Sequence, residues 1–276
     1  NILACTIYIY KYYYVMNDLL GVFDSSHYAN LAVNNQENFK KANPFPHIYL
    51  DNFLPENIAD EVSNSIPSPY DDTFDWISRD RENEVKQKMQ FDESKLPFSV
   101  RMILREFNSK QFLLFLETLT GIDNLIPDPY FIGGGIHVAM KGDFLKVHAD
   151  HNWHYKLYTH RRVNALLYLS QKDWIEDWGG HLEMWDEKMT GPQASIAPFF
   201  NRLVVFETTD KTNHGRPDPL NCPEGIYRKA LNLYYYTSKR DNAEISDPHF
   251  TLYRTENSPY DVENKKEYID QGKNKS

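Results

Sequence analysis

Short runs of alternating apolar and polar residues fill the second half of the chain, and this pattern most limits the possible folds. From residue 129 onward the apolar period falls toward two, and turn residues recur about every ten positions. Strands that follow one another without crossover helices pair antiparallel, as in a jelly roll or barrel. The candidate strands are 131–140, 144–150, 162–170, 180–186, 192–197, 202–208, 212–216 and 228–237.

Helical patterns in the first half predict a layer that supports this barrel. Residues 43–55 predict a strand that enters a turn, and residues 55–66 predict a helix with Pro55 at its start. Residues 96–122 form the strongest helical pattern, and Gly121 is its stop signal. We therefore predict a mainly β member of the α+β class, a jelly roll (double-stranded β-helix) with N-terminal supporting helices.

The rest of the chain is polar, and it sets the expected domain limits. Residues 17–43 and 71–97 are expected to be mostly loop. The expected organisation is an N-terminal extension (1–43), one domain (44–240) with a helical layer (44–128) and a jelly-roll core (129–240), and a C-terminal tail (241–276).

Residues 1–15 leave two alternatives open. Their apolar run is shorter than the roughly 20 residues of a membrane-spanning helix, and it contains Lys11. A basic segment and a cleavage site, which a signal peptide needs, are missing. Because the first methionine is Met16, these residues are either upstream sequence that is not native or a loosely attached strand or anchor.

Charge and cysteine content exclude several classes of function. The net charge of -9 argues against nucleic acid as the main partner. The short basic runs 79–81 and 160–162 are expected to be solvated surface charge. Cys5 and Cys222 lie far apart, so neither a disulfide framework nor a cysteine zinc site is expected. This usage favours a reducing, cytoplasmic location, and no membrane partner is expected.

A dense histidine segment, "KVHADHNWH" (146–154), predicts a metal site. Residues i and i+2 of a strand share a face, so His148 and Asp150 project together while His151 points the other way. His214 follows the strand 202–208 and can reach them from across the barrel. Two histidines and one carboxylate form the facial triad of non-haem Fe(II) oxygenases. A zinc hydrolase is disfavoured because the chain has no HExxH motif.

Arg228 is the second residue that indicates a binding site, because it is the first residue of the predicted strand 228–237. A buried guanidinium is costly unless it meets an anion. Its planar fork matches a carboxylate at two points. The sequence thus places a carboxylate-binding group on the same barrel as the predicted metal site.

With these residues the chain resembles the prolyl 4-hydroxylase-like group of 2-oxoglutarate- and Fe(II)-dependent dioxygenases, over about residues 44–254. The segments that carry the resemblance are "GGGIHVAMKGDFLKVHAD" (133–150), "RRVNALLYLSQKDWIEDWGGHLEMW" (161–185), "RLVVFETTDKTNHGRPDPLNCPEG" (202–225) and "RKALNLYYYT" (228–237).

The resemblance implies a role for individual residues. His148, Asp150 and His214 would bind Fe(II), and Arg228 would bind the distal carboxylate of 2-oxoglutarate. The other implied cosubstrate-pocket residues are Tyr168, Leu166, Asn164 and, near the metal, Tyr234.

The chain also departs from the family's pattern. Ala230 stands where many relatives carry a hydroxyl group. The residue before the HxD motif that contacts the cosubstrate is either His137 or Met140. Asp150 argues against a halogenase, where a small residue replaces the carboxylate.

The implied reaction is hydroxylation of a C–H bond with dioxygen, with release of succinate and CO2 and with ascorbate in support. By resemblance the substrate is a prolyl residue of a peptide or protein, which Arg161 would contact. A free amino acid or other small metabolite is the alternative within this class. A non-enzymatic, cupin-like jelly-roll binding module is the alternative of another class. The sequence says nothing about the oligomeric state.

Overall fold

The computed structural model of the 276-residue chain describes residues 19–254. The predictions for residues 1–15 and for the end of the C-terminal tail therefore lie outside the described residues. None of the described helices is long and apolar enough to cross a membrane.

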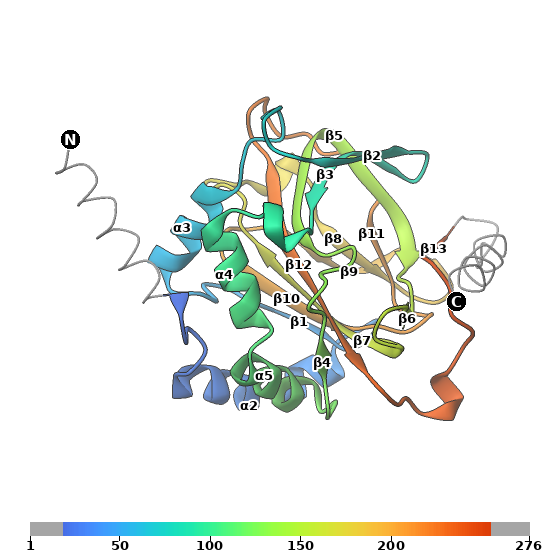
Figure 1. Ribbon diagram of the computed structural model, residues 1–276. Coiled ribbons are helices and arrows are strands. Elements are labelled where there is room, and N and C mark those ends of the chain that lie inside the picture. Colours follow the sequence, from blue (N-terminus) through green and yellow to red (C-terminus); the bar gives the residue numbers. More distant parts are fainter. Residues whose placement is uncertain (1–18, 255–276) are drawn as a thin grey trace.

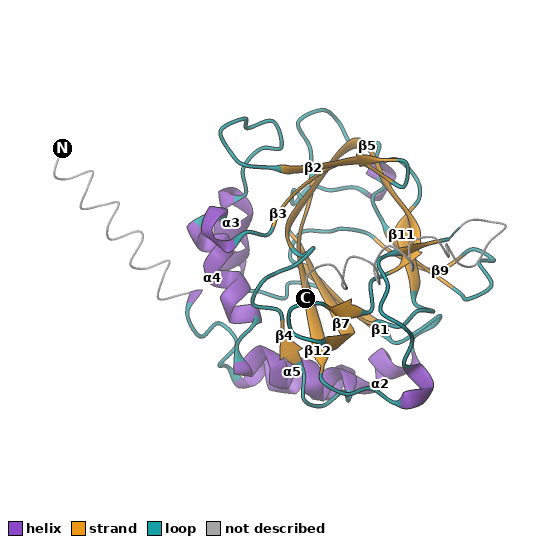
Figure 2. Ribbon diagram, turned by 45° about the vertical axis from the view of Figure 1, so that its right-hand side comes forward, coloured by secondary structure: helices purple, strands orange, loops and turns teal. Residues whose placement is uncertain are grey.

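A curved antiparallel sheet forms most of the described structure and bends into a nearly closed barrel (Figures 1 and 2). Its main path runs in the order β1-β10-β7-β12-β5-β11-β8-β9. This is the jelly roll that the alternating pattern predicts. The strands are β1 (His47–Leu50), β2 (Ile77–Arg81), β3 (Glu84–Gln90), β4 (Ile126–Pro127), β5 (Gly135–Ala149), β6 (Trp153–His154), β7 (Thr159–Tyr168), β8 (Leu182–Trp185), β9 (Pro192–Ile196), β10 (Arg202–Glu207), β11 (Asn213–Arg216), β12 (Arg228–Thr237) and β13 (Leu252–Tyr253).

The central strands are buried on both faces, which explains their almost continuous apolar sequence. On β10, Leu203 and Val205 belong to the core beneath the helices. Val204 and Phe206, on the same strand, belong to a second core inside the barrel. Alternate residues of one strand therefore hold the barrel to its helical layer and fill its interior.

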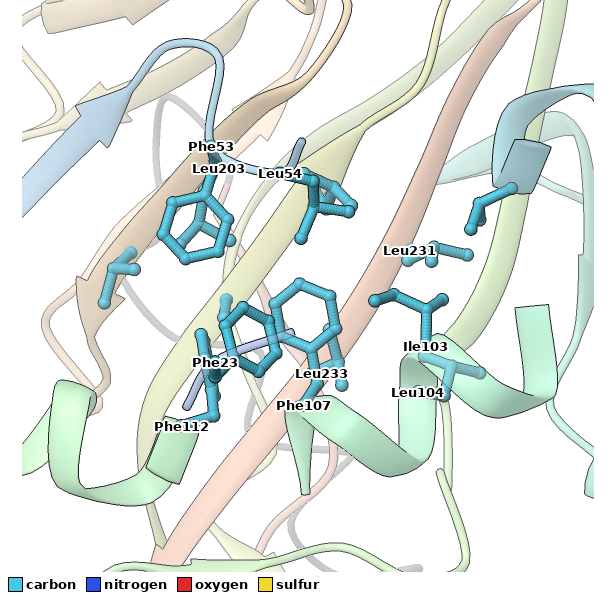
Figure 3. Close-up of a cluster of buried hydrophobic side chains, with 14 of the residues drawn as sticks. Phe23, Phe53, Leu54, Ile103, Leu104, Phe107, Phe112, Leu203, Leu231 and Leu233 are labelled. Carbon is cyan, nitrogen blue, oxygen red and sulfur yellow. The ribbon is translucent and has the colours of Figure 1, made fainter. Parts of the chain in front are cut away.

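The helices lie together along one side of the barrel (Figure 2). They are α2 (Ser26–Lys41), α3 (Glu56–Ser65), α4 (Phe98–Phe107) and α5 (Lys110–Thr120), with short 3-10 turns at Glu93–Lys95, Glu176–Trp178 and Asn242–Glu244. Phenylalanine rings fill the space between them and the sheet (Figure 3). These rings are Phe23, Phe53, Phe107 and Phe112.

Two predicted helical regions are present, one of them divided. The helix expected over 55–66 is α3, and Gly121 ends α5 in the left-handed conformation with φ 74°. The region 96–122, however, forms two helices. Ser109 interrupts it, because its hydroxyl accepts a hydrogen bond from the backbone N–H of Phe112 and so caps a new helix, α5.

The prediction of loop structure for residues 17–43 and 71–97 was wrong. The first region contains α2, whose buried face consists only of Tyr28, Ala32 and Phe39, spaced as on a helix but sparse in a polar sequence. The second contains the hairpin of β2 and β3. Its strand β3 pairs with the distant β5, and this pairing supplies backbone hydrogen bonds that a local pattern does not reveal.

Two further differences concern the barrel and the tail. The two strands expected at 131–140 and 144–150 form one long strand, β5. Past residue 240, β13 pairs with β5 beside His148 and Ala149. The start of the predicted tail thus lies against the barrel, while the domain limits themselves remain predictions.

Candidate active site

His148, Asp150 and His214 come together at one end of the barrel. His148 lies on β5, Asp150 follows that strand directly, and His214 is the register partner of His148 on β11. One ligand atom from each lies within 4.8 Å of the others. Among the described residues this is the one group of three or more His, Cys, Asp or Glu side chains with such spacing.

A glycine permits the two histidine strands to approach. A Cβ atom at Gly215 would lie 2.8 Å from the Cα of Val147 and 2.9 Å from the carbonyl oxygen of Leu145. Any larger residue would push β11 away from β5. His214 and Arg216 are two residues apart on β11, so both side chains face the interior, and the register with β5 shifts between them.

Backbone carbonyls orient both imidazoles. The Nδ1 atom of His148 lies 2.8 Å from the Lys146 carbonyl oxygen, and that of His214 lies 3.0 Å from the Thr212 carbonyl oxygen. A carbonyl only accepts, so each Nδ1 carries the proton. Each Nε2 then keeps its lone pair, and these atoms lie 3.5 Å and 3.4 Å from the Asp150 carboxylate. This is the tautomer that a metal ligand needs.

Two donors from β7 hold the Asp150 carboxylate. Its Oδ2 atom accepts a hydrogen bond from Arg161 Nη2 at 3.0 Å and from Asn164 Nδ2 at 2.7 Å. Burial alone would raise the pKa of Asp150. The Arg161 charge, with His214 and His148, outweighs burial and holds this pKa well below its usual value.

Arg161 is buried, not solvated as its run of basic residues predicted. Its side chain is 1% exposed. Its guanidinium carbon lies 3.5 Å from the centre of the Tyr234 ring, and the Tyr234 hydroxyl donates to the carbonyl oxygen of Gly133. Arg79, from the other basic run, also lines the pocket. The prediction of surface charge was therefore wrong for Arg161, whereas the Arg79 side chain is still 34% exposed.

His151 lines the same pocket, contrary to the prediction that it points away. β5 ends at Ala149, so strand alternation no longer applies at position 151. Burial and the Arg161 charge hold the pKa of His151 well below its usual value, so the imidazole is neutral and accepts from Arg161 Nη1.

Arg228 stands at the other end of the pocket. Its Nε donates to the Gly180 carbonyl oxygen at 2.9 Å, and its Nη2 donates to the Tyr168 hydroxyl at 3.0 Å. Arg228 is 4% exposed, yet no carboxylate among the described residues forms an ion pair with it. Burial lowers its pKa to about 10. The remaining hydrogen-bonding capacity of this cation suits an anion from outside the protein.

The other predicted pocket residues differ in what they contact. Leu166 lines the cavity together with Leu182 and Phe206, and the Phe206 ring also packs against the His214 imidazole, with the ring centres 4.7 Å apart. Asn164 instead donates to Asp150, so the structure places it at the metal end. Ala230 is fully buried and offers no hydroxyl group.

Of the two candidates before the HxD motif, only His137 lines this cavity. Met140 borders a different depression, beside Trp76. The Nε2 atom of His137 faces the carbonyl oxygens of Gly133 and Gly134. Burial, with the charges of Arg79 and Arg228, lowers the pKa of His137 to about 3. The imidazole is therefore neutral at physiological pH.

Sequence reasoning missed a buried ion pair on the pocket wall. Arg216, two residues after His214 and on the same side of β11, pairs with the fully buried Asp143. The i, i+2 rule that grouped His148 with Asp150 would have found Arg216 beside His214. Its partner Asp143 lies in the middle of β5 and carries no comparable local signal.

The pocket measures about 150 Å³, room for about five water molecules. One end offers two imidazole lone pairs and a carboxylate, the donor set of mononuclear Fe(II) oxygenases. The other end offers a buried guanidinium without a carboxylate partner among the described residues. The residues present thus fit a divalent iron and a carboxylate-bearing molecule.

Comparison with known proteins agrees with this chemistry. The model of the 2OG-Fe(II) oxygenase superfamily matches residues 134–236, which include His148, Asp150, His214 and Arg228. This match, together with the geometry of the site, supports an oxygenase enzyme that uses Fe(II), 2-oxoglutarate and dioxygen. The match argues against a non-enzymatic binding module. No curated protein sequence matches the chain.

Solved structures with the same fold include prolyl hydroxylases. A Trichoplax adhaerens prolyl hydroxylase, in complex with a hypoxia inducible factor peptide fragment, is 19% identical, with a TM-score of 0.56, over 80% of this chain and 96% of that one. A Pseudomonas putida prolyl-4-hydroxylase is 17% identical, with a TM-score of 0.53, over 75% and 99%. HygX from Streptomyces hygroscopicus, with nickel, 2-oxoglutarate and hygromycin B bound, is 10% identical, with a TM-score of 0.51, over 74% and 87%. The prolyl 4-hydroxylase-like resemblance is thus confirmed for the fold.

Proposed function

We propose that His148, Asp150 and His214 bind Fe(II), and that Arg228 binds the distal carboxylate of 2-oxoglutarate. The observation that carries this proposal is a two-histidine, one-carboxylate group in the same enclosed pocket as a buried arginine without a carboxylate partner among the described residues. Bound there, the iron supplies the chemistry that couples oxidation of 2-oxoglutarate to succinate and CO2 with hydroxylation of a C–H bond.

The side chains of the chain then have separate tasks. His148 and His214 direct their Nε2 atoms toward the metal end, because backbone carbonyl oxygens accept hydrogen bonds from their Nδ1 atoms. Tyr168 orients the Arg228 guanidinium toward the far end of the cosubstrate. The apolar wall around Leu166 keeps water from this end, which strengthens the charge pairing.

A prolyl residue of a peptide or protein is our first candidate substrate. The Trichoplax structure, which contains a peptide, and the Pseudomonas prolyl-4-hydroxylase share this fold and support the candidate. Tyr253 and Thr251, from the segment beside β5, line the pocket together with Arg79 from the hairpin of β2 and β3. A peptide would enter between these two segments.

A small metabolite is the second candidate, and the pocket wall offers one observation in its favour. The Nδ1 atom of His137 and the Oε1 atom of Gln87 are buried and without hydrogen-bond partners. Both residues line the pocket. A small molecule rich in hydroxyl or amino groups would provide donors that a prolyl ring lacks.

We further propose that ascorbate supports turnover and that the protein is cytoplasmic. The first rests on the resemblance to the dioxygenases, and the second on the cysteine usage. The acidic net charge supports the expectation that nucleic acid is not the substrate.

Succinate formation tests the proposed chemistry without a known substrate. Purified protein is incubated with Fe(II), 2-oxoglutarate, ascorbate and air, and wild type is compared with His148→Ala. We expect succinate from wild type and a loss of it in the variant. Equal succinate from both proteins would contradict the assignment. So would a wild-type protein that forms no succinate and binds neither iron nor 2-oxoglutarate.

The substrate candidates are then separated by mass spectrometry. Proline-containing peptides and hydroxylated small molecules are incubated with the active enzyme. Gain of one oxygen atom on a prolyl residue supports the first candidate. Gain of one oxygen atom on a small molecule, with unmodified peptides, supports the second.

A further inference from the structure

Only one oxygen of the Asp150 carboxylate accepts hydrogen bonds from β7. Both strong donors, from Arg161 and Asn164, reach Oδ2 of Asp150. Each oxygen also lies near one histidine, Oδ2 at 3.4 Å from Nε2 of His214 and Oδ1 at 3.5 Å from Nε2 of His148, but Oδ1 receives no hydrogen bond from β7. The two oxygens of one carboxylate are therefore in unequal environments.

The two donors are also fixed to each other. Arg161 Nε donates to Asn164 Oδ1 at 2.9 Å, so the amide accepts on one side and donates to Asp150 on the other. This settles the orientation of the amide. Arg161 Nη1 contacts His151, and the guanidinium lies on the Tyr234 ring. Each nitrogen of Arg161 thus has a partner within the protein.

A bulge in β7 creates this pair. Residues three apart in a regular strand face opposite sides. Against β12, Tyr235 pairs with Val163 while Tyr236 pairs with Arg161, so Arg162 is an extra residue in β7. The bulge turns Arg161 inward beside Asn164 and leaves Arg162 to pair with Glu207. Bulges that redirect side chains are common next to active sites.

We propose that Arg161 and Asn164 are positioning residues that hold Oδ2 of Asp150 and leave Oδ1 to bind the metal alone. The inference rests on the proposed iron site. One-point binding by Asp150 leaves more of the metal's positions open for other molecules than two-point binding does. Arg161 therefore acts through Asp150 and is not a substrate contact, in contrast to its expected role.

Metal binding in the absence of any reaction tests this inference. Arg161→Lys keeps the positive charge but cannot form the fork, and Asn164→Leu keeps the size but removes the donor. Arg162→Met is the matched control, since the neighbouring arginine pairs with Glu207 away from the metal end. Affinity for Mn(II) is measured by titration, and the visible spectrum of bound Co(II) reports the coordination. Circular dichroism verifies that each variant is folded.

We expect each variant to lose about 10- to 100-fold in Mn(II) affinity and to change the Co(II) spectrum, while the control matches wild type. The double variant should lose less than the product of the two single losses, since both residues act on one oxygen. Folded variants with wild-type affinity and spectrum would overturn the inference while the proposed iron site stands. A wild-type protein that binds neither metal would overturn the proposed site, and the inference with it.

Discussion

Arg161 and Arg228, two of the three buried arginines that line the pocket, have opposite surroundings. Arg161, at the metal end, meets the carboxylate of Asp150 and uses its nitrogens on groups of the protein. Arg228, at the cosubstrate end, meets only the Gly180 carbonyl and the Tyr168 hydroxyl. They are 1% and 4% exposed, so burial does not distinguish them.

The difference shows how a structure separates a positioning cation from a binding cation. A buried charge that is paired within the protein serves the fold and holds its partner in place. A buried charge without a carboxylate partner among the described residues stabilises the protein only when an anion arrives. At the metal end the charge of Arg161 is thus paired with that of Asp150, whereas the charge of Arg228 at the cosubstrate end needs an external anion.

Removal of the paired arginine should have the largest effect. We expect Arg161→Met to destabilise the metal-free protein by about 3–5 kcal/mol, because Asp150 is left as a buried charge without its cation. Urea unfolding of wild type, Arg161→Met and the control Arg162→Met measures this. A decrease in the free energy of unfolding of less than about 1 kcal/mol, the contribution of one ordinary hydrogen bond, would show that Arg161 is not an essential partner of Asp150.

The pH dependence of stability should report the burial of His137 in the pocket. The pKa of His137 is about 3 in the folded protein against 6.5 in the unfolded chain, because burial, and to a smaller extent the charges of Arg79 and Arg228, disfavour the imidazolium. As pH falls below the unfolded value, the unfolded chain binds a proton that the native protein does not, so stability falls.

Replacement of His137 should remove this acid sensitivity. Between about pH 7 and pH 5 we expect His137→Gln to lose on the order of 2 kcal/mol less stability than wild type. Urea unfolding at both pH values gives the difference, with the exposed His27→Gln as the control. Identical losses in wild type and His137→Gln would show that His137 does not stay neutral.

Loss of the hydroxyl that orients Arg228 should have a smaller effect. Tyr168→Phe removes one hydrogen bond to the guanidinium, and we expect 2-oxoglutarate affinity to fall about 10-fold. Calorimetric titration into the Mn(II)-loaded protein measures this affinity, with the surface variant Tyr49→Phe for comparison. An unchanged affinity for 2-oxoglutarate would show that the Tyr168 hydroxyl does not contribute to cosubstrate binding.

Removal of Arg228 should change the stability of the ligand-free protein least. Arg228→Met removes two hydrogen bonds and also a buried charge without a carboxylate partner. These effects oppose one another, so we expect a change within about 1 kcal/mol. Thermal or urea unfolding without metal and cosubstrate tests this. A loss as large as that expected for Arg161→Met would mean that Arg228 is paired within the protein.

Local sequence patterns predicted the parts of the fold that depend on near neighbours. Alternation predicted the barrel strands, and helical spacing with a glycine stop predicted α3 and the end of α5. The hairpin of β2 and β3 depends on pairing with β5, and α2 depends on packing against α5. These contacts lie far apart in sequence, so composition alone suggested loops.

For the site, the i, i+2 rule placed His148 and Asp150 together, but it failed where the strand is irregular. His151 lies past the end of β5, and Arg161 precedes the bulge at Arg162. A bulge leaves no mark in the apolar pattern. The inward turn of Arg161, and with it the difference between the two arginines, was therefore beyond sequence reasoning.

Binding of 2-oxoglutarate to Arg228 variants tests the central claim most directly. Calorimetric titration is made into Mn(II)-loaded wild type, Arg228→Lys, Arg228→Met and the control Arg162→Met. We predict that Arg228→Met weakens binding on the order of 100-fold, that Arg228→Lys falls between, and that the control equals wild type. Wild-type affinity in a folded Arg228→Met variant would show that the buried arginine does not receive the cosubstrate.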